Sequence, residues 1–319
     1  MREITAAQRD LILDAVGEGL SPLPAGVLEK DLLVTAVLRS LAEFQGSAEI
    51  VFCGGTCLSK AHGLVRRMSE DVDFKIQGPA STSRGAARRA LSDLKHAVAG
   101  HLRGAGYELP AEGVQSRAEN TKISLRVAYD SRFPAVASLR SEIRVQLVAS
   151  PPRLPVEVLP LGSLLGEVID LNEAPVPWAC VGVPETLAEK VVALLRRLSM
   201  DDPAEERPGA GELIRHVYDV AMIERSNADA GDDGAHAVFR AAALGDAREF
   251  AKRDPMFARD PFVAMERALA SLHGNRDESL RTAYGRFAAD MVYGEVPSFE
   301  EARELFTSVA RRLLVEELR

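Results

Sequence analysis

The sequence predicts an α+β fold, in which a domain with a mixed β-sheet is followed by an α-helical domain. Segments that are rich in Val, Ile and Leu and alternate between apolar and polar residues fall in the first half of the chain. Beyond the prolines at positions 175, 177 and 184, apolar residues recur only at helical spacing. We therefore expect a sheet domain over residues 1–178 and a helical domain over residues 179–319.

The composition is that of a soluble globular protein, with 46% hydrophobic and 27% charged residues among 319. A net charge of −8 argues against a protein that coats nucleic acid without selectivity. Cys53, Cys57 and Cys180 form no C-x-x-C pair, so we expect reduced thiols and a cytoplasmic location. No apolar run of 18 residues and no signal peptide occur, so we expect no membrane partner.

Two helices are expected before the first strand. Residues 5–16 form the first, because Thr5 and Gln8 have the spacing of a capping box. Residues 27–44 form the second helix, because their apolar residues recur at helical spacing. Glu29-Lys30-Asp31 is interpreted as a charged first turn of this helix.

The centre of the chain predicts a βαβ-like unit. Residues 50–53 form a buried strand, and Gly54-Gly55-Thr56 form a turn whose N–H groups can approach a phosphate closely. A helix over residues 58–65 and a second strand over residues 70–76 follow.

Asp71 and Asp73 lie on one face of that second strand, about 6.6 Å apart along the chain, because side chains alternate between the two faces of a strand. Val72 and Phe74 then point into the core. Two carboxylates side by side repel each other, and a Mg²⁺ or Mn²⁺ ion between them relieves the repulsion. Either motif alone is common in proteins, and their order and spacing are what favour a nucleotide site.

A helix over residues 85–103 carries four cationic side chains, which either contact an RNA backbone or form an ordinary solvated surface. Two strands, over residues 121–129 and 141–149, extend the sheet. In the second half, residues 184–197 and 214–223 form helices, and four further helices are expected between residues 235 and 319.

These motifs resemble the signature of the AbiEii/AbiGii-type toxin nucleotidyltransferases, a branch of the DNA polymerase β-like superfamily that includes the mycobacterial MenT toxins. The family pattern is a GG[ST] turn, a Lys a few residues on, and R-F-S-E-D-I-D-[FL], and Met68 stands here where Phe is usual. The matching residues are Gly54, Gly55, Thr56, Lys60, Arg67, Ser69, Glu70, Asp71, Asp73 and Phe74. The later patterns E-x-[LM]-x-x-K and R-D-x-[YF]-D are matched by Glu185, Leu187, Lys190, Arg215, Tyr218 and Asp219, with His216 in place of the first Asp. Glu29-Lys30-Asp31 resembles the family's E-K-D-[YW] element, with Leu32 in place of the aromatic residue.

The resemblance implies a polymerase β-like domain in a toxin of a toxin–antitoxin or phage-defence system. Such an enzyme transfers NMP from an NTP with Mg²⁺, and the implied acceptor is the 3′ end of tRNA. It also permits a cognate antitoxin protein as a partner.

The resemblance also implies roles for individual residues. Asp71 and Asp73 hold the metal, while Gly54, Gly55 and Thr56 cradle the phosphates. The remaining implied residues are Lys60 and Lys190, which neutralise the leaving group, and Asp219, which positions or deprotonates the acceptor hydroxyl. Ser69 lies two residues before Asp71, so alternation opens its hydroxyl towards the phosphates if the strand extends that far. Through Lys190 and Asp219 the helical domain completes the active site.

One position departs from the superfamily pattern, which expects a third acidic residue on the strand over residues 141–149. Gln146 fits the register better but is an amide, and Glu142 is the acidic alternative. Two other functions remain open on the sequence alone. One is a catalytically degenerate protein that binds nucleotides or a partner, and the other is nucleotidyl transfer to a protein or small molecule.

Overall fold

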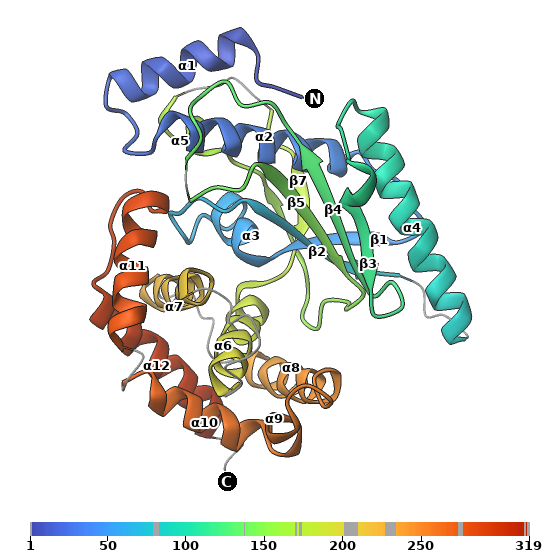
Figure 1. The fold of residues 1–319 in the computed structure, drawn as a ribbon, viewed down its shortest axis with the longest axis vertical. Helices are drawn as coiled ribbons and strands as arrows, with labels where there is room; N and C mark the ends of the chain where they lie inside the picture. The colour runs from blue at the N-terminus through green and yellow to red at the C-terminus, as the bar shows by residue number, and fades with distance from the viewer. Residues whose placement is uncertain are drawn as a thin grey trace. The chain divides into compact units, whose positions relative to one another are not determined.

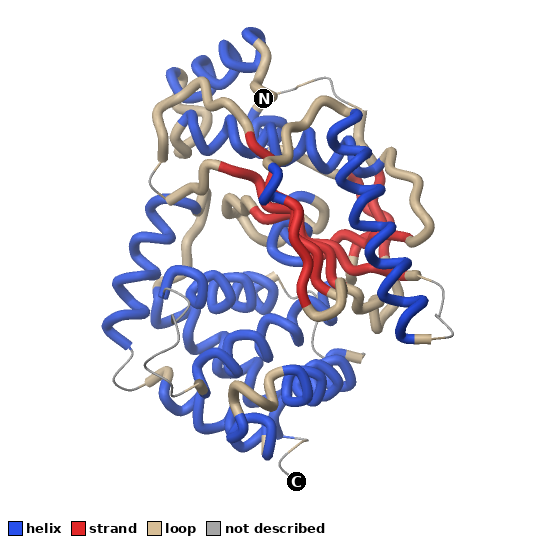
Figure 2. The backbone as a smooth tube through the Cα atoms, turned by 45° about the vertical axis from the view of Figure 1, so that its right-hand side comes forward, coloured by secondary structure: helices blue, strands red, loops and turns tan. Residues whose placement is uncertain are grey.

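The computed structural model describes residues 2–78, 83–136, 138–169, 171, 174–200, 210–226, 234–273, 277–315 and 317. The chain divides into two compact units, Met1–Val181 and Gly182–Arg319. Strands occur in the first of these units, and the described residues of the second are helical or connecting segments (Figures 1 and 2).

The first unit contains a seven-stranded sheet with the order β3-β4-β5-β2-β1-β7-β6. The sheet is mixed, as predicted, because β2 pairs with β5 and β1 with β7 in parallel, while the other neighbours are antiparallel. The strands are β1 (Glu49–Cys53), β2 (Asp71–Gln77), β3 (Val114–Arg117), β4 (Lys122–Ala128), β5 (Glu142–Val148), β6 (Glu157–Pro160) and β7 (Pro177–Cys180).

Alternation gives the sheet one apolar and one polar face. On β4 and β5 every second residue is buried, and Val72 and Phe74 of β2 are buried as predicted. Lys95 of α4 (Arg84–Gly104) donates a hydrogen bond of 3.2 Å to Ser116 of β3, which shares a face with the buried Ile123. The helix α4 therefore lies on the apolar side of the sheet.

The first two helices of this unit and α4 lie close to their predicted positions, whereas the short helix Leu164–Val168 was not predicted. The capping box of Thr5 and Gln8 is present at the start of the first helix. The helices are α1 (Ala6–Gly17), α2 (Ala25–Ala42), α3 (Gly54–Lys60) and α5 (Leu164–Val168), with a 3₁₀ turn η1 (Ala111–Gly113).

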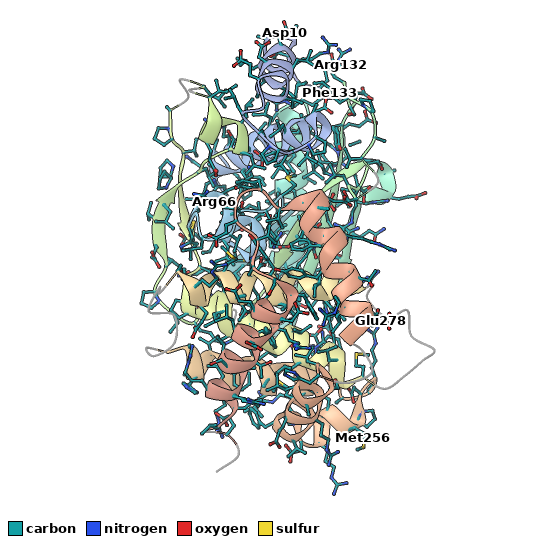
Figure 3. All side chains as sticks on the ribbon, turned by 90° about the vertical axis from the view of Figure 1, so that its left-hand side faces the viewer. Asp10, Arg66, Arg132, Phe133, Met256 and Glu278 are labelled. Carbon is teal, nitrogen blue, oxygen red and sulfur yellow. The ribbon has the colours of Figure 1, made fainter. Side chains whose placement is uncertain are left out.

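The central unit differs from the predicted βαβ arrangement. The strands β1 and β2 are direct antiparallel neighbours, and the helix between them covers Gly54–Lys60 instead of the predicted residues 58–65. Gly54, with φ of +79°, turns the chain from strand into helix in one step. The helix then ends early, because the chain reverses at Gly63, where φ is +65°. Of the two arginines that follow, Arg66 is exposed (Figure 3) and Arg67 is buried.

The sequence does not predict β6 and β7, because the prolines around them, among them Pro155 and Pro177, indicate breaks in the chain. Pro160 and Pro177 face each other at the end of this short antiparallel pair. A proline at the first residue of a strand gives up a single N–H bond, so β7 still pairs with β1 at Cys180.

The second unit is helical, as predicted. One short helix, α9, was missed between two predicted helices, where Asp254 caps its first turn. The helices are α6 (Val183–Ser199), α7 (Ala210–Arg225), α8 (Ala235–Glu249), α9 (Pro255–Arg259), α10 (Pro261–Ser271), α11 (Asp277–Met291) and α12 (Phe299–Val315).

Two further features concern the cysteines and the apolarity of the helices. The three cysteines are free thiols. Among the described residues, no helix combines the length and apolarity needed to cross a bilayer.

Candidate active site

The carboxylates of Asp71 and Asp73 lie on the polar face of β2, in the middle of the sheet. The parallel pairing of β2 with β5 sets Gln146 directly beside Asp73. Glu142, the alternative for the third acidic position, lies at the start of β5, where its carboxylate is 3.6 Å from the Arg126 guanidinium. The register partner of Asp73 is therefore an amide, and that of Asp71 is Arg144.

The two glycines at the start of α3 pack closely against Asp73 and Arg67. A Cβ atom on Gly54 would lie 2.7 Å from Asp73 Oδ2, and one on Gly55 would overlap the Arg67 guanidinium. The side chain of the N-cap residue, Cys53, makes no capping hydrogen bond with the first turn of α3. This helix start, whose first N–H groups have no acceptor within the helix, thus lies next to Asp73.

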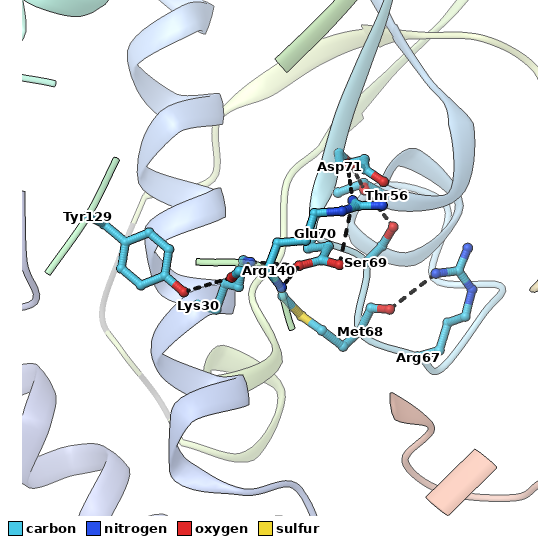
Figure 4. A network of polar contacts seen from close by, with 9 residues as sticks. All are labelled: Lys30, Thr56, Arg67, Met68, Ser69, Glu70, Asp71, Tyr129 and Arg140. Atoms are coloured by element: carbon cyan, nitrogen blue, oxygen red, sulfur yellow. Dashed lines mark hydrogen bonds and ion pairs between the residues drawn. The ribbon is translucent and has the colours of Figure 1, made fainter. Parts of the chain in front are cut away.

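Thr56 and Ser69 join the glycine turn to β2. Their hydroxyl oxygens are 2.8 Å apart, and the Thr56 hydroxyl also donates to the Asp71 carbonyl (Figure 4). The strand β2 begins at Asp71, so the alternation used to predict the direction of Ser69 does not reach it. The Ser69 hydroxyl is buried against Thr56 instead of opening outwards.

An ion pair beside Asp71, absent from the sequence predictions, holds the loop before β5. Lys30 Nζ lies 2.6 Å from Glu70 Oε2, and both side chains are buried. Glu70 Oε2 accepts a 2.9 Å hydrogen bond from the Arg140 N–H, and Lys30 donates to the Arg140 carbonyl. The Arg140 guanidinium in turn lies 2.7 Å from Asp71 Oδ1 (Figure 4).

Burial and charge act in opposite directions on the two members of this pair. Burial lowers the pKa of Lys30, although the charge of Glu70 opposes the shift. For Glu70, burial alone would raise the pKa, but the charge and hydrogen bond of Lys30, together with Arg140, outweigh it and the pKa is lowered. Burial and the charges of Glu29 and Glu70 raise the pKa of Tyr129 to about 12, so its hydroxyl keeps the proton that it donates to the Arg140 carbonyl.

The segment Glu29-Lys30-Asp31 is a buried anchor and not a solvated first turn. All three residues are at most 1% exposed. Glu29 binds the loop before β5 through a backbone N–H and a hydroxyl, and Asp31 binds Lys60 and the N–H of Leu164 at the start of α5. Each charge of this segment therefore holds a different part of the first unit.

Lys60 is turned towards α2. Its Nζ lies 2.6 Å from Asp31 Oδ1 and 2.8 Å from Thr35 Oγ1, and the residue is buried. A contact with a triphosphate requires Lys60 to leave this pair, so its phosphate role stays a prediction.

In the second unit, the structure brings Lys190 and Asp219 together. Lys190 Nζ of α6 lies 2.6 Å from Asp219 Oδ2 of α7. The Asp219 side chain is fully buried and that of Lys190 is 10% exposed. Two residues that the sequence places 29 positions apart thus form one ion pair.

A hollow of about 410 Å³ lies over the polar face of β3, β4 and β5. Its charged lining consists of Arg117, Lys122, Arg126 and Arg144, with Glu142 as the one carboxylate among the described lining residues. Arg144 pairs in register with Asp71, so the hollow continues the face that carries the two aspartates.

The donor set on this face fits one hard cation. Among the described residues, no group of three or more His, Cys, Asp and Glu side chains is placed to hold a metal ion. Asp71, Asp73 and Gln146 offer two carboxylates and an amide oxygen, which are ligands that Mg²⁺ accepts when water and phosphate complete its shell.

A helix that begins at two glycines lies next to paired carboxylates on the open face of a mixed sheet. This arrangement is that of a nucleotidyltransferase type of site. Residues 36–305 match the family model described as "Nucleotidyl transferase AbiEii toxin, Type IV TA system". The chain therefore belongs to the AbiEii nucleotidyltransferase toxin family. The match begins after Glu29-Lys30-Asp31.

Among solved structures, the nucleotidyltransferase toxin MenT4 from Mycobacterium tuberculosis H37Rv is similar to this chain, with 19% identity and a TM-score of 0.49. The match covers 96% of this chain and 98% of MenT4. No curated protein matches the chain.

Proposed function

We propose that the protein transfers a nucleoside monophosphate from an NTP to the 3′ end of tRNA, with release of pyrophosphate. The observation that carries the proposal is the position of Asp71 and Asp73, on one open strand face beside the first turn of α3. The choice of tRNA rests on the resemblance to the toxin family.

The first unit supplies the groups that hold the nucleotide. Asp71 and Asp73, with the Gln146 amide beside them, would bind one Mg²⁺ or Mn²⁺ ion, which when bound supplies positive charge to the phosphates. Gly54 lies against Asp73, and we assign the N–H groups of Gly54 and Gly55, at the start of α3, as donors to phosphate oxygens. Thr56 and Ser69 border this turn, and Lys60 would join it on leaving Asp31.

The reaction forms a bond between the acceptor hydroxyl oxygen and the α-phosphorus and breaks the bond from that phosphorus to the bridging oxygen of pyrophosphate. The hydroxyl proton must be accepted, and the leaving group gains negative charge. We assign the first task to Asp219 and the second to Lys190, the roles that the resemblance to the toxin family implies for the members of this buried ion pair.

The acceptor side of the proposal is supported by the hollow over β3, β4 and β5. Four cations and one carboxylate line it, so it attracts a polyanion despite the negative net charge of the chain. We place the RNA strand there, with its 3′ end next to Asp71. A cytoplasmic toxin of this kind would be restrained by a cognate antitoxin.

The test is to incubate the purified protein and Mg²⁺ with each of the four α-labelled NTPs and total tRNA. Label on RNA that depends on Asp71 and Asp73 supports the proposal. Label on protein or on a small product would refute the acceptor, and label that survives Asp71→Ala would refute the metal assignment.

Gln146 favours a second candidate function. An amide in place of the third carboxylate is what a protein that binds NTP without turnover could carry. NTP binding with no labelled product under any condition would favour this function, and Gln146→Glu would then be the variant with which to look for gained transfer.

A further inference from the structure

The Arg140 guanidinium occupies the place of a cation beside Asp71. The two side chains are 27% and 23% exposed, so the 2.7 Å ion pair lies at the border of the polar face and not in the core. The same guanidinium lies 3.6 Å from Glu70 Oε1. The pair neutralises one of the two carboxylates that the proposed function assigns to the divalent ion.

The backbone of Arg140 is held independently of its side chain. Glu70 binds its N–H, and Lys30 and Tyr129 bind its carbonyl. These contacts fix the backbone of Arg140 and do not involve its guanidinium, which points towards Asp71 (Figure 4). When another cation binds Asp71, the long Arg140 side chain can therefore rotate away without movement of the loop.

A divalent ion and the guanidinium compete for Asp71. Both cannot bind Oδ1, and a doubly charged ion a few ångströms from Arg140 would be repelled by it. A triphosphate removes this conflict, because it brings negative charge for the ion and oxygens to which a guanidinium can bind in bidentate fashion.

We propose that Arg140 is a phosphate-binding residue that neutralises Asp71 until the NTP and its divalent ion enter together. This inference rests on the proposed function. The side chain then passes from Asp71 Oδ1 to a phosphate oxygen of the nucleotide. This exchange couples the binding of the ion and the NTP positively. The ion binds weakly alone, and the ion and the NTP each strengthen the binding of the other by the same factor.

The experiment measures Mn²⁺ binding to the full-length protein by electron paramagnetic resonance, with and without an NTP analogue that has a methylene bridge between the α- and β-phosphates. An opposite charge close to a carboxylate shifts its proton affinity by one to three pKa units. We therefore expect Arg140→Gln to bind Mn²⁺ alone about tenfold more tightly than the wild type. The analogue should bind this variant more weakly and should strengthen its Mn²⁺ binding less.

Two matched variants isolate the effect. Arg132→Gln removes the same charge from the same loop at a surface position (Figure 3). Arg132 pairs there with Glu3, and the variant should bind Mn²⁺ like the wild type. Arg140→Lys keeps the charge but not the planar donor pair, so it should keep weak Mn²⁺ binding and lose affinity for the analogue.

Mn²⁺ affinity that is unchanged or lower in a folded Arg140→Gln protein would overturn the inference, as would full analogue affinity in Arg140→Lys. Asp71→Asn separates this failure from failure of the proposed function. If Mn²⁺ binding depends on Asp71 but not on Arg140, only the inference falls. If it does not depend on Asp71, the metal assignment falls with it.

Discussion

Lys30→Met tests whether the buried ion pair of Lys30 and Glu70 holds the first unit together. The change keeps most of the side-chain volume and removes the charge 2.6 Å from Glu70 Oε2. Glu70 would retain the Arg140 N–H at 2.9 Å and the guanidinium at 3.6 Å. Removing one partner of a buried pair costs about 3–5 kcal/mol, because the other charge stays buried without it. We expect a loss of this size in the free energy of unfolding.

The pH dependence of this loss gives an independent check of its cause. In the wild type the pKa of Glu70 is lowered, so its stabilising contribution is present above the ordinary pKa of a glutamate and is lost as pH falls through the folded-state value. Without Lys30, burial should raise the pKa of Glu70, so the folded state binds a proton more readily than the unfolded state. The deficit of Lys30→Met relative to the wild type should therefore shrink as pH falls from neutral towards the ordinary glutamate pKa.

Urea unfolding at several pH values, followed by circular dichroism, measures both effects. Arg84→Met is the matched control, because Arg84 also pairs with a glutamate, Glu119, but with its side chain 85% exposed. We expect no measurable change for this variant. A loss below about 1 kcal/mol for Lys30→Met, or a deficit that grows as pH falls, would refute the assignment of the pair as a buried anchor.

Three further predictions concern the proposed reaction. Asp71→Ala and Asp73→Ala should each abolish transfer while changing thermal stability little, because both lie on the open face of β2. Replacing Arg88 and Arg89, on the exposed side of α4, with Glu should weaken RNA labelling without changing NTP binding. If RNA labelling changes neither with this substitution nor with salt concentration, this side of α4 does not contact RNA. Ser69→Ala should retain transfer, whereas Ser69→Asp should lose it through added charge beside the phosphates, and an active, folded Ser69→Asp protein would contradict this role.

The parts of the fold that the sequence predicts are those that local patterns specify. Alternation identified β4 and β5 and put Val72 and Phe74 inside, because one buried face imposes a period of two. The short strand β7 was not predicted, because its support is tertiary. It pairs with β1 at a single position, and Trp178 packs against the rings of Phe52 and Phe74 at 6.0 and 5.1 Å.

The same distinction separates the predicted from the missed residues of the site. Asp71 and Asp73 are two residues apart, so strand geometry alone puts them together. Arg140 lies 69 residues from Asp71 and 110 from Lys30, in a loop without periodicity, and no local rule connects them. One signal for the burial of Glu29-Lys30-Asp31 was present in the sequence, because these three consecutive charges lie between two apolar pairs in one helix. A helix of this kind buries charged side chains wherever it packs on more than one side.

The sequence and the structure assign different partners to Lys60, and an experiment can decide between them. The toxin signature gives it a triphosphate, whereas the structure gives it Asp31, itself bound to the N–H at the start of α5. If the pair with Asp31 is permanent, Lys60→Met should lower the free energy of unfolding by about 3–5 kcal/mol and leave the affinity for the NTP analogue unchanged. If Lys60 leaves Asp31 for the nucleotide, analogue affinity must fall. Measuring both quantities on Lys60→Met and Asp31→Asn decides, because loss of analogue affinity in the lysine variant alone assigns Lys60 to the phosphates. Equal loss of stability with unchanged affinity in both variants assigns it to the scaffold.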